Sequence, residues 1–345
     1  MTVSSCVAAR ASSGAGIASR ARIADRARVA SRAAPRRAAA SGRAPPVASA
    51  VPKVNRIIAR AHSLLPPDPP SRRASTPPAE PFLAPPALPP ICQGSKVLVV
   101  GSTGGVGQLV VAKLLDAGYA VRAVSRNLDA ARGLFGSPAN LELRVADLRD
   151  ADALDASEIC VGVDAVVSCT GTTAFPSARW KDDNGPEQTD FVGVRNLVDA
   201  TRAQSPSCKR FVLVSSIGVE RTNQMPFLVL NLFGVLKHKR AGELALESSG
   251  IPFTVLRPGR LTDGPYTSYD INTLLRATSG TRRAVDLVEG DTLTPEETSR
   301  IAVADCAVAA LASDNAENRA FCLGTREGAG PGSDAGAWEK LFASA

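Results

Sequence analysis

The chain has 345 residues, is 44% hydrophobic and carries a formal net charge of +7. Residues 1–90 contain 14 basic and three acidic side chains, so the remainder carries about −4. The basic character belongs to the N-terminal segment, and we predict no nucleic-acid binding by the rest. The seven scattered cysteines include no CxxC pair, which excludes the common zinc and disulfide patterns. We therefore predict no metal site.

Residues 1–60 are predicted to be an organelle transit peptide. They are rich in Ala, Arg and Ser, are poor in acidic residues, and lack the run of about 7 to 15 apolar residues that a secretory signal needs. The predicted destination is the chloroplast, with the stroma as its compartment. A mitochondrial destination is the alternative, because both kinds of leader share this composition. A retained basic arm that binds polyanions is a second alternative.

Residues 61–92 are predicted to be a proline-rich, disordered linker. Eleven prolines fall between Pro66 and Pro90, and such a composition stays extended and packs no core. Farther on, the apolar run Met225–Leu236 is too short to cross a bilayer of about 30 Å. We therefore predict no transmembrane segment, and contact of this run with a membrane surface or a protein partner stays an open alternative.

Residues 93–325 alternate short, β-branched apolar segments with amphipathic segments. The first type predicts strands at 96–101, 120–126, 141–147, 164–170, 210–216 and 252–259. The second type predicts helices at 106–117, 128–135, 189–204 and 233–248. This alternation predicts an α/β domain with a doubly wound parallel sheet of the Rossmann type. We expect a single domain with a small C-terminal extension on the substrate side, followed by a Gly-rich tail with a short helix at 326–345.

The first predicted strand runs directly into the sequence GSTGGVG, which opens the first helix. Its GxxGxxG spacing suits a backbone that turns sharply and approaches a pyrophosphate, which then lies against free N–H groups at the helix N-terminus. The strand before it and the helix after it favour a dinucleotide site over a simple tight turn. The predicted cofactor-binding residues here are Gly101, Thr103, Gly104, Gly105, Val106 and Gly107.

The end of the second predicted strand distinguishes the two nicotinamide cofactors. NAD sites place an acidic residue there for the ribose 2′-hydroxyl, whereas NADP sites place an arginine for the 2′-phosphate. This chain has Ser125 and Arg126 and no acid, so NADP (NADPH) is the predicted cofactor; a merely solvated Arg126 is the alternative. The residues closing the third and fourth strands are predicted to contact the adenine and the cofactor ribose: Asp147, Leu148, Cys169, Thr170 and Gly171.

Together these motifs resemble the short-chain dehydrogenase/reductase superfamily. The resemblance spans about residues 96–324 and rests on GSTGGVG, ADL, SCTG, VLVSSIGV, HKRAGE and LRPGRL. The segments at 179–200 and 256–275 resemble its atypical branch of chloroplast-targeted NAD(P)-binding Rossmann-fold proteins in plants and algae. A more distant similarity extends to NmrA-like regulators and to the NADP-binding stromal component of the inner-envelope translocon. The resemblance implies an NADP-binding oxidoreductase fold.

The superfamily's active site has a Ser or Thr after the fifth strand, and a Tyr four residues before a Lys on the next helix. Positions i and i+4 share one helical face, so the lysine can bind the nicotinamide ribose and lower the pKa of the tyrosine. The resemblance implies Lys239 and Ser216 as catalytic residues, Lys239 and Ser215 as cofactor contacts, and Val235 at the tyrosine position. The structural alternatives are a solvated Lys239–Glu243 ion pair and a serine that satisfies backbone groups.

The segment RPGR after the sixth strand resembles the part of the family that meets the nicotinamide carboxamide. This adds Pro258, Gly259 and Arg260 to the predicted cofactor residues. Lys237, His238 and Arg240 are predicted to be solvated, and a role of His238 as the proton donor is the alternative. Tyr266 and Tyr269 are further candidates to replace the missing phenol, although a structural role is favoured for both.

Two functions are predicted. The first is a plastid oxidoreductase that uses NADPH to reduce a small carbonyl, quinone or activated double bond, and it is favoured by Lys239 and Ser216. The alternative is a non-catalytic NADP(H)-sensing or scaffold protein acting through a protein partner, and it is favoured by the missing tyrosine. An RNA-binding role is disfavoured by the acidic balance of residues 91–345. The predicted partners are therefore the nucleotide and an unidentified small-molecule substrate.

Overall fold

A computed structural model describes residues 91–261, 281–293 and 297–345. The predicted transit peptide, nearly all of the predicted linker, Tyr266 and Tyr269 lie outside the described residues. The first five strands of the sheet are β1 (Lys96–Val100), β2 (Ala120–Ser125), β3 (Leu141–Val145), β4 (Ala165–Ser168) and β5 (Arg210–Val214). The other three are β6 (Phe253–Pro258), β7 (Ala284–Glu289) and β8 (Arg319–Arg326).

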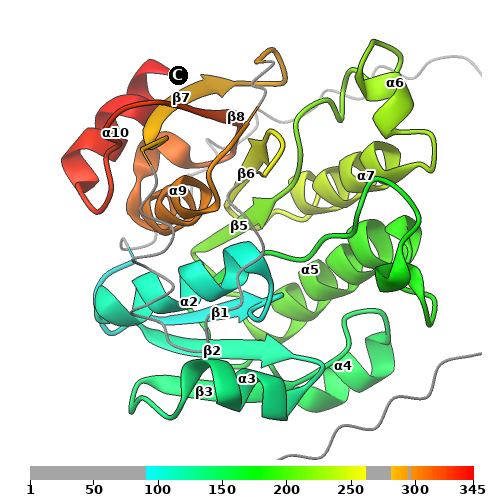
Figure 1. The fold of residues 1–345 in the computed structure, drawn as a ribbon. Helices are drawn as coiled ribbons and strands as arrows, with labels where there is room; N and C mark the ends of the chain where they lie inside the picture. The colour runs from blue at the N-terminus through cyan, green and yellow to red at the C-terminus, as the bar shows by residue number, and fades with distance from the viewer. Residues whose placement is uncertain (1–90, 262–280, 294–296) are drawn as a thin grey trace, which may run out of the picture. The chain divides into compact units, whose positions relative to one another are not determined.

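The eight strands form one sheet in the order β3-β2-β1-β4-β5-β6-β8-β7 (Figure 1). All neighbouring strands are parallel except β7 and β8, which are antiparallel. In the register, Val97 of β1 lies opposite Val121 of β2 on one side and Ala165 of β4 on the other. The order of the strands reverses between β1 and β4, as in doubly wound dinucleotide-binding domains. The predicted Rossmann-type α/β fold is confirmed.

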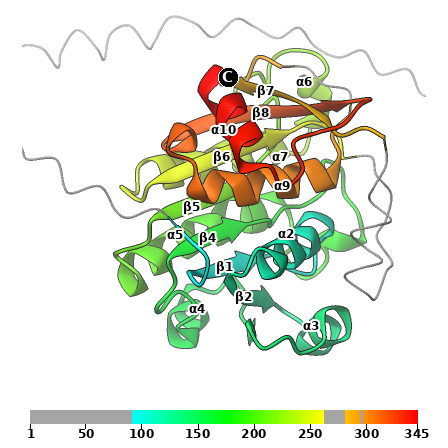
Figure 2. The same cartoon turned by 90° about the vertical axis from the view of Figure 1, so that its left-hand side faces the viewer.

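Helices cover both faces of the sheet (Figure 2). Contacts in the core place α2 (Gly105–Asp116), α3 (Leu128–Phe135), α9 (Arg300–Ala312) and α10 (Ala335–Ser344) on one face. The other face carries α4 (Ala151–Ser157), α5 (Gly193–Gln204) and α7 (Val235–Glu247). Shorter pieces complete the unit: η1 (Ala178–Trp180), a π-helix η2 (Glu187–Val192), α6 (Phe227–Leu230) and η3 (Asp314–Ala316).

Strands β1 to β6 were predicted from short, apolar, β-branched segments, as expected for a sheet that helices cover on both faces. Residues Val97–Val100 are completely buried, because helices cover both faces of β1. Helix α9 was not predicted, because its sequence RIAVADCAVAALA is apolar on nearly every side and shows no helical period. Strands β7 and β8 were also missed. In the C-terminal tail, Trp338 and Phe342 of α10 are buried, so this helix belongs to the same core.

Local polar contacts set several helix starts. Asn127 accepts a hydrogen bond from the backbone N–H of Ala130 at 2.9 Å and so begins α3. Asp150 and Asp334 do the same for α4 and α10. Among the residues that the structure describes, every helix is too short or too polar to cross a membrane.

Candidate functional site

A cavity of about 1090 Å³ lies at the carboxyl ends of the parallel strands. It extends across the reversal point between β1 and β4, where open α/β sheets bind their ligands. All of the predicted cofactor-binding and catalytic residues line it, except Gly107 and Arg260. The structure therefore brings together side chains and backbone from the ends of β1 to β6 and from α7.

The glycine turn after β1 is shaped by close backbone contacts. Gly101 has a φ of +69°, and its carbonyl accepts a hydrogen bond from the N–H of Gly104 at 3.0 Å. A Cβ on Gly107 would lie 2.2 Å from the Gly101 oxygen, so this glycine lets α2 close onto the turn from behind the cavity. Helix α2 has no side-chain cap. The first N–H groups of α2 therefore remain available to an anion.

The end of β2 presents a cation to the cavity. The hydroxyl of Ser125 donates to the carbonyl of Asn127 at 3.0 Å and accepts from its N–H at 3.1 Å, which fixes the turn into α3. Arg126 is exposed, and its Nη1 donates to Oδ1 of Asn184 at 3.0 Å. Asn184 is a neutral partner, so this hydrogen bond does not neutralise the guanidinium.

Arg149 is a cavity residue that the sequence analysis missed. Its Nη2 and Nε donate to the carboxylate of Asp147 at 2.6 and 2.9 Å, and Nη1 donates to the carbonyl of Asp182 at 2.6 Å. The hydrogen bonds from Arg149 lower the pKa of Asp147 below its usual value. Arg149 thereby ties the end of β3 to the loop that follows η1. Its position two residues after Asp147 was the available signal.

Lys239 reaches the cavity from α7, and its partner is not the one that helical spacing suggested. Its Nζ lies 2.7 Å from Oδ1 of Asp190, a buried residue of η2 that the sequence analysis did not single out. Glu243, four residues after Lys239, is completely buried and binds elsewhere. The alternative of a solvated Lys239–Glu243 pair is therefore wrong, because tertiary contacts give each residue a different partner.

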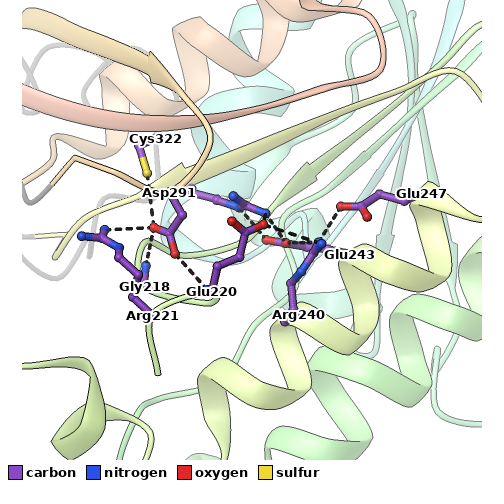
Figure 3. A network of polar contacts seen from close by, with 9 residues as sticks. Gly218, Glu220, Arg221, Arg240, Glu243, Glu247, Asp291 and Cys322 are labelled. Atoms are coloured by element: carbon purple, nitrogen blue, oxygen red, sulfur yellow. Dashed lines mark hydrogen bonds and ion pairs between the residues drawn. The ribbon is translucent and has the colours of Figure 1, made fainter. Parts of the chain in front are cut away.

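Glu243 belongs to an ionic network between α7 and β6 (Figure 3). Its carboxylate accepts hydrogen bonds from Nη2 of Arg257 at 2.7 Å and from Nη1 of Arg240 at 2.9 Å. Arg257 also binds Glu220 at 2.8 Å, and Arg240 binds Glu247 at 2.5 Å. Arg240 was expected to be solvated, but the acidic neighbours draw it into this partly buried network.

Val235, which the resemblance assigned to the tyrosine position, does not line the cavity. Val235 is 3% exposed and packs in an apolar cluster with Ile217, Val219 and Phe227. His238, a candidate replacement, is not among the residues that line the cavity. Among the described residues, no phenol or imidazole therefore lines this cavity.

Two serines follow β5 and line the cavity, and their hydroxyl groups differ in hydrogen bonding. The hydroxyl of Ser216 donates to the carbonyl of Ile217 at 3.2 Å, whereas the buried Ser215 hydroxyl has no hydrogen-bond partner within the described part of the chain. Ser215 thus presents an unused donor and acceptor at the end of β5.

The turn after β6 is held by Thr298, which the sequence analysis also missed. The N–H of Gly259 donates to Oγ1 of Thr298 at 2.9 Å, and that hydroxyl donates to the carbonyl of Leu323 at 3.0 Å. This arrangement fixes the backbone of Pro258 and Gly259 along the cavity. The side chain of Arg260 is 76% exposed and pairs with Glu297 at 3.5 Å, away from the cavity lining.

The residues present fit a dinucleotide. The glycine turn and uncapped start of α2 suit a pyrophosphate, and three buried polar atoms of the lining have no partner among the described residues. These are Oε1 of Gln108, Oγ1 of Thr172 and Oγ of Ser215.

Comparisons with known proteins agree with this geometry. The family model described as NAD(P)H-binding matches residues 101–314. An uncharacterized chloroplastic protein of Arabidopsis thaliana is 35% identical over 224 residues, which cover 63% of this chain and 71% of that protein. The chloroplastic protein TIC 62 of Pisum sativum is 36% identical over 179 residues, but this match covers 47% of this chain and only 32% of TIC 62.

A further curated protein and a solved structure are also similar to the chain. Sanguinarine reductase of Eschscholzia californica is 29% identical over 272 residues, covering 68% of this chain and 90% of that enzyme. Among solved structures, the oxidoreductase ylbE of Lactococcus lactis superposes with a TM-score of 0.53 at 18% identity, over 72% of this chain and 95% of that one. At this identity the superposition shows the shared fold alone.

Proposed function

Since the chain belongs to the NAD(P)H-binding family, we propose that it is a plastid reductase that uses NADPH. The proposed acceptor is a small carbonyl, a quinone or an activated double bond. The observation that carries the choice of cofactor is Arg126, at the end of β2 where an NAD site would have an acid. Its guanidinium faces the cavity and has the uncharged Asn184 as its hydrogen-bond partner, so it can pair with a 2′-phosphate.

The bound nucleotide would supply a hydride, and the protein would supply orientation. Lys239 would bind the nicotinamide ribose, the backbone of Gly259 would meet the carboxamide, and the free hydroxyl of Ser215 would face the ligand. Val235, which the resemblance assigned to the position of the family's proton-donating phenol, is buried and has no proton to donate. This supports acceptors that need little help with protonation, such as quinones, over simple ketones.

The plastid location is supported by relatives that carry the description chloroplastic and by the composition of residues 1–60. A fluorescent reporter fused to residues 1–90 should enter the plastid stroma. A mitochondrial signal would support the alternative address, and a diffuse cytosolic signal would contradict the transit peptide.

The second candidate function is an NADP(H)-sensing or scaffold protein. It is favoured by the same buried Val235, because nucleotide binding does not require a proton donor. Calorimetric titration with NADPH and NADH, followed by turnover assays with ketones, quinones and enones, separates the two functions. We expect preferential binding of NADPH and turnover with quinones or enones. Tight NADPH binding without turnover on any acceptor would favour the sensor, and absence of binding would reject both.

A further inference from the structure

Asp190 is a buried acidic residue that has no role in the reaction proposed above. Its side chain is 1% exposed, and its Oδ1 lies 2.7 Å from Nζ of Lys239, whose side chain is 12% exposed. Its second oxygen, Oδ2, is buried and has no hydrogen-bond partner within the described residues. A buried carboxylate is costly unless it is paired, so the ammonium of Lys239 is held tightly at this point.

The chain brings three elements together at this pair. Asp190 lies in the π-helix η2, an irregular turn of a kind that is frequent at functional sites. A Cβ on Gly242 of α7 would lie 2.5 Å from the backbone oxygen of Asp190, so only glycine there lets α7 approach η2 this closely. A Cβ on Gly171, after β4, would lie 3.0 Å from Nζ of Lys239. Gly242 within α7 and Gly171 after β4 therefore leave room for the pair.

The ion pair with Asp190 leaves N–H donors of Lys239 available for other hydrogen bonds. An ammonium group has three N–H donors, and the one hydrogen bond described for Lys239 is the bond to Asp190. Lys239 and Gly171 line the cavity, whereas Asp190 lies behind them. The remaining donors can therefore bind a ligand hydroxyl from a position that the carboxylate has already set, which removes the entropy cost of ordering a long side chain.

We propose that Asp190 is the positioning residue of the nucleotide site, and that it aims the ammonium of Lys239 at the hydroxyls of the nicotinamide ribose. This inference rests on the proposed function, because it needs a nucleotide in the cavity. Asp190 does not touch the ligand itself and acts through Lys239.

The test is a double-mutant cycle in the full-length protein, with NADPH affinity measured by calorimetry. Asp190→Asn and Lys239→Met should each weaken NADPH binding by roughly 10-fold or more. The double variant should bind no more weakly than Lys239→Met alone, because both changes remove the same interaction. The matched control is Glu187→Gln, which removes a charge from an exposed position of the same π-helix and should leave the affinity unchanged.

A second measurement distinguishes a role of Asp190 in positioning Lys239 from a role in stabilising the fold. In protein labelled with ¹⁵N-lysine, the ammonium of Lys239 should give a resonance protected from solvent exchange, identified by its loss in Lys239→Met. Asp190→Asn should lose this resonance and keep a cooperative unfolding transition. Lys239→Met should unfold at a lower urea concentration than the double variant, because it alone leaves Asp190 buried without its cation.

Failure of the positioning role and failure of the proposed function give different results. Unchanged NADPH affinity in Asp190→Asn, or losses that add in the double variant, would overturn the positioning role while the proposed function stands. A wild-type protein that binds no nucleotide would overturn the proposed function together with the ribose role. The protected resonance would then report the ion pair as structural only.

Discussion

Helix α7 sends charged side chains toward two different parts of the molecule. Toward β6, Arg240 and Glu243 join Arg257 in a network in which the buried Glu243 carboxylate accepts hydrogen bonds from both guanidinium groups (Figure 3). Toward the cavity, Lys239 meets a single carboxylate, Asp190, and that carboxylate keeps one oxygen without a partner. Residues only one and four positions apart in the sequence therefore have different electrostatic surroundings.

This difference suggests a distinction between charged groups that stabilise the fold and polar groups that bind a ligand. In the network, Glu243 and Arg257 are paired within the protein, because an unpaired buried charge is destabilising. Groups that bind a ligand keep unused hydrogen-bonding capacity until the ligand arrives. Ser215, Thr172 and Gln108 at the cavity fit the second description. The following substitutions test whether this division holds.

The largest effect is expected from the network. Glu243→Ala leaves the guanidinium of Arg257, which is 1% exposed, with only the partly exposed Glu220. We expect a loss of about 3 to 5 kcal/mol in the free energy of unfolding, measured by urea denaturation. Glu247→Ala is the control, and it should cost no more than about 1 kcal/mol because that side chain is 28% exposed. Equal losses would contradict the distinction between buried and exposed members.

On the cavity side, Arg126→Ala should weaken NADPH binding by about 1.5 to 3 kcal/mol, or roughly 10 to 150-fold. NADH binding should hardly change, because NADH has no 2′-phosphate. Calorimetric titration of both nucleotides measures this, with Arg132→Ala on the exposed side of α3 as the control. Equal losses for the two nucleotides would show that Arg126 does not recognise the phosphate.

Val235→Tyr places the family's usual residue in the apolar cluster beside the network. The site is 3% exposed and filled by Ile217 and Phe227, so the larger ring should cost about 1 to 3 kcal/mol of stability. Ketone reduction should stay slow, because this position does not line the cavity. Comparison with Val235→Leu separates added bulk from the phenol. Brisk ketone turnover by the tyrosine variant would show that the ring reaches the nucleotide.

A smaller, pH-dependent effect is expected at Asp291, a further buried acid near the network (Figure 3). Burial alone would raise its pKa, but hydrogen bonds from the N–H groups of Gly218 and Glu220 and from Arg221 outweigh burial and hold the pKa below the usual value. The carboxylate therefore stabilises the fold above about pH 4, and this stabilisation is lost as the pH falls through the lowered pKa.

Asp291→Asn should lower the free energy of unfolding by roughly 1.5 kcal/mol at pH 7. The difference in this free energy between the variant and the wild type should become smaller near pH 3. Urea midpoints at the two pH values measure it. Asp286→Asn is the control, because that side chain is 42% exposed and pairs with an exposed arginine. If the stability difference between Asp291→Asn and the wild type grew in acid, the pKa of Asp291 would be raised in the folded protein instead of lowered.

The sequence by itself determined the class of fold and about half of the cavity lining. The glycine turn and the residues closing β1 to β6 could be located because each is set by contacts within a few residues or by the end of an apolar strand. Parallel strands then bring their carboxyl ends to one edge of the sheet, whatever the details of packing. The resemblance to the family pointed to Lys239, which lies at the cavity. Its assignment of Val235 to the tyrosine position stays a prediction.

Only the tertiary structure decided which charges meet. Asp190 and Lys239 are 49 residues apart, and their contact depends on a π-turn and on the close approach that Gly242 allows. Thr298 reaches Gly259 from 39 residues away. Helical spacing paired Lys239 with Glu243, but the buried Arg257 on a neighbouring strand offers that carboxylate a stronger partner. A local pattern specifies which residues share a face, whereas burial and the groups on the opposing element decide which of them form a pair.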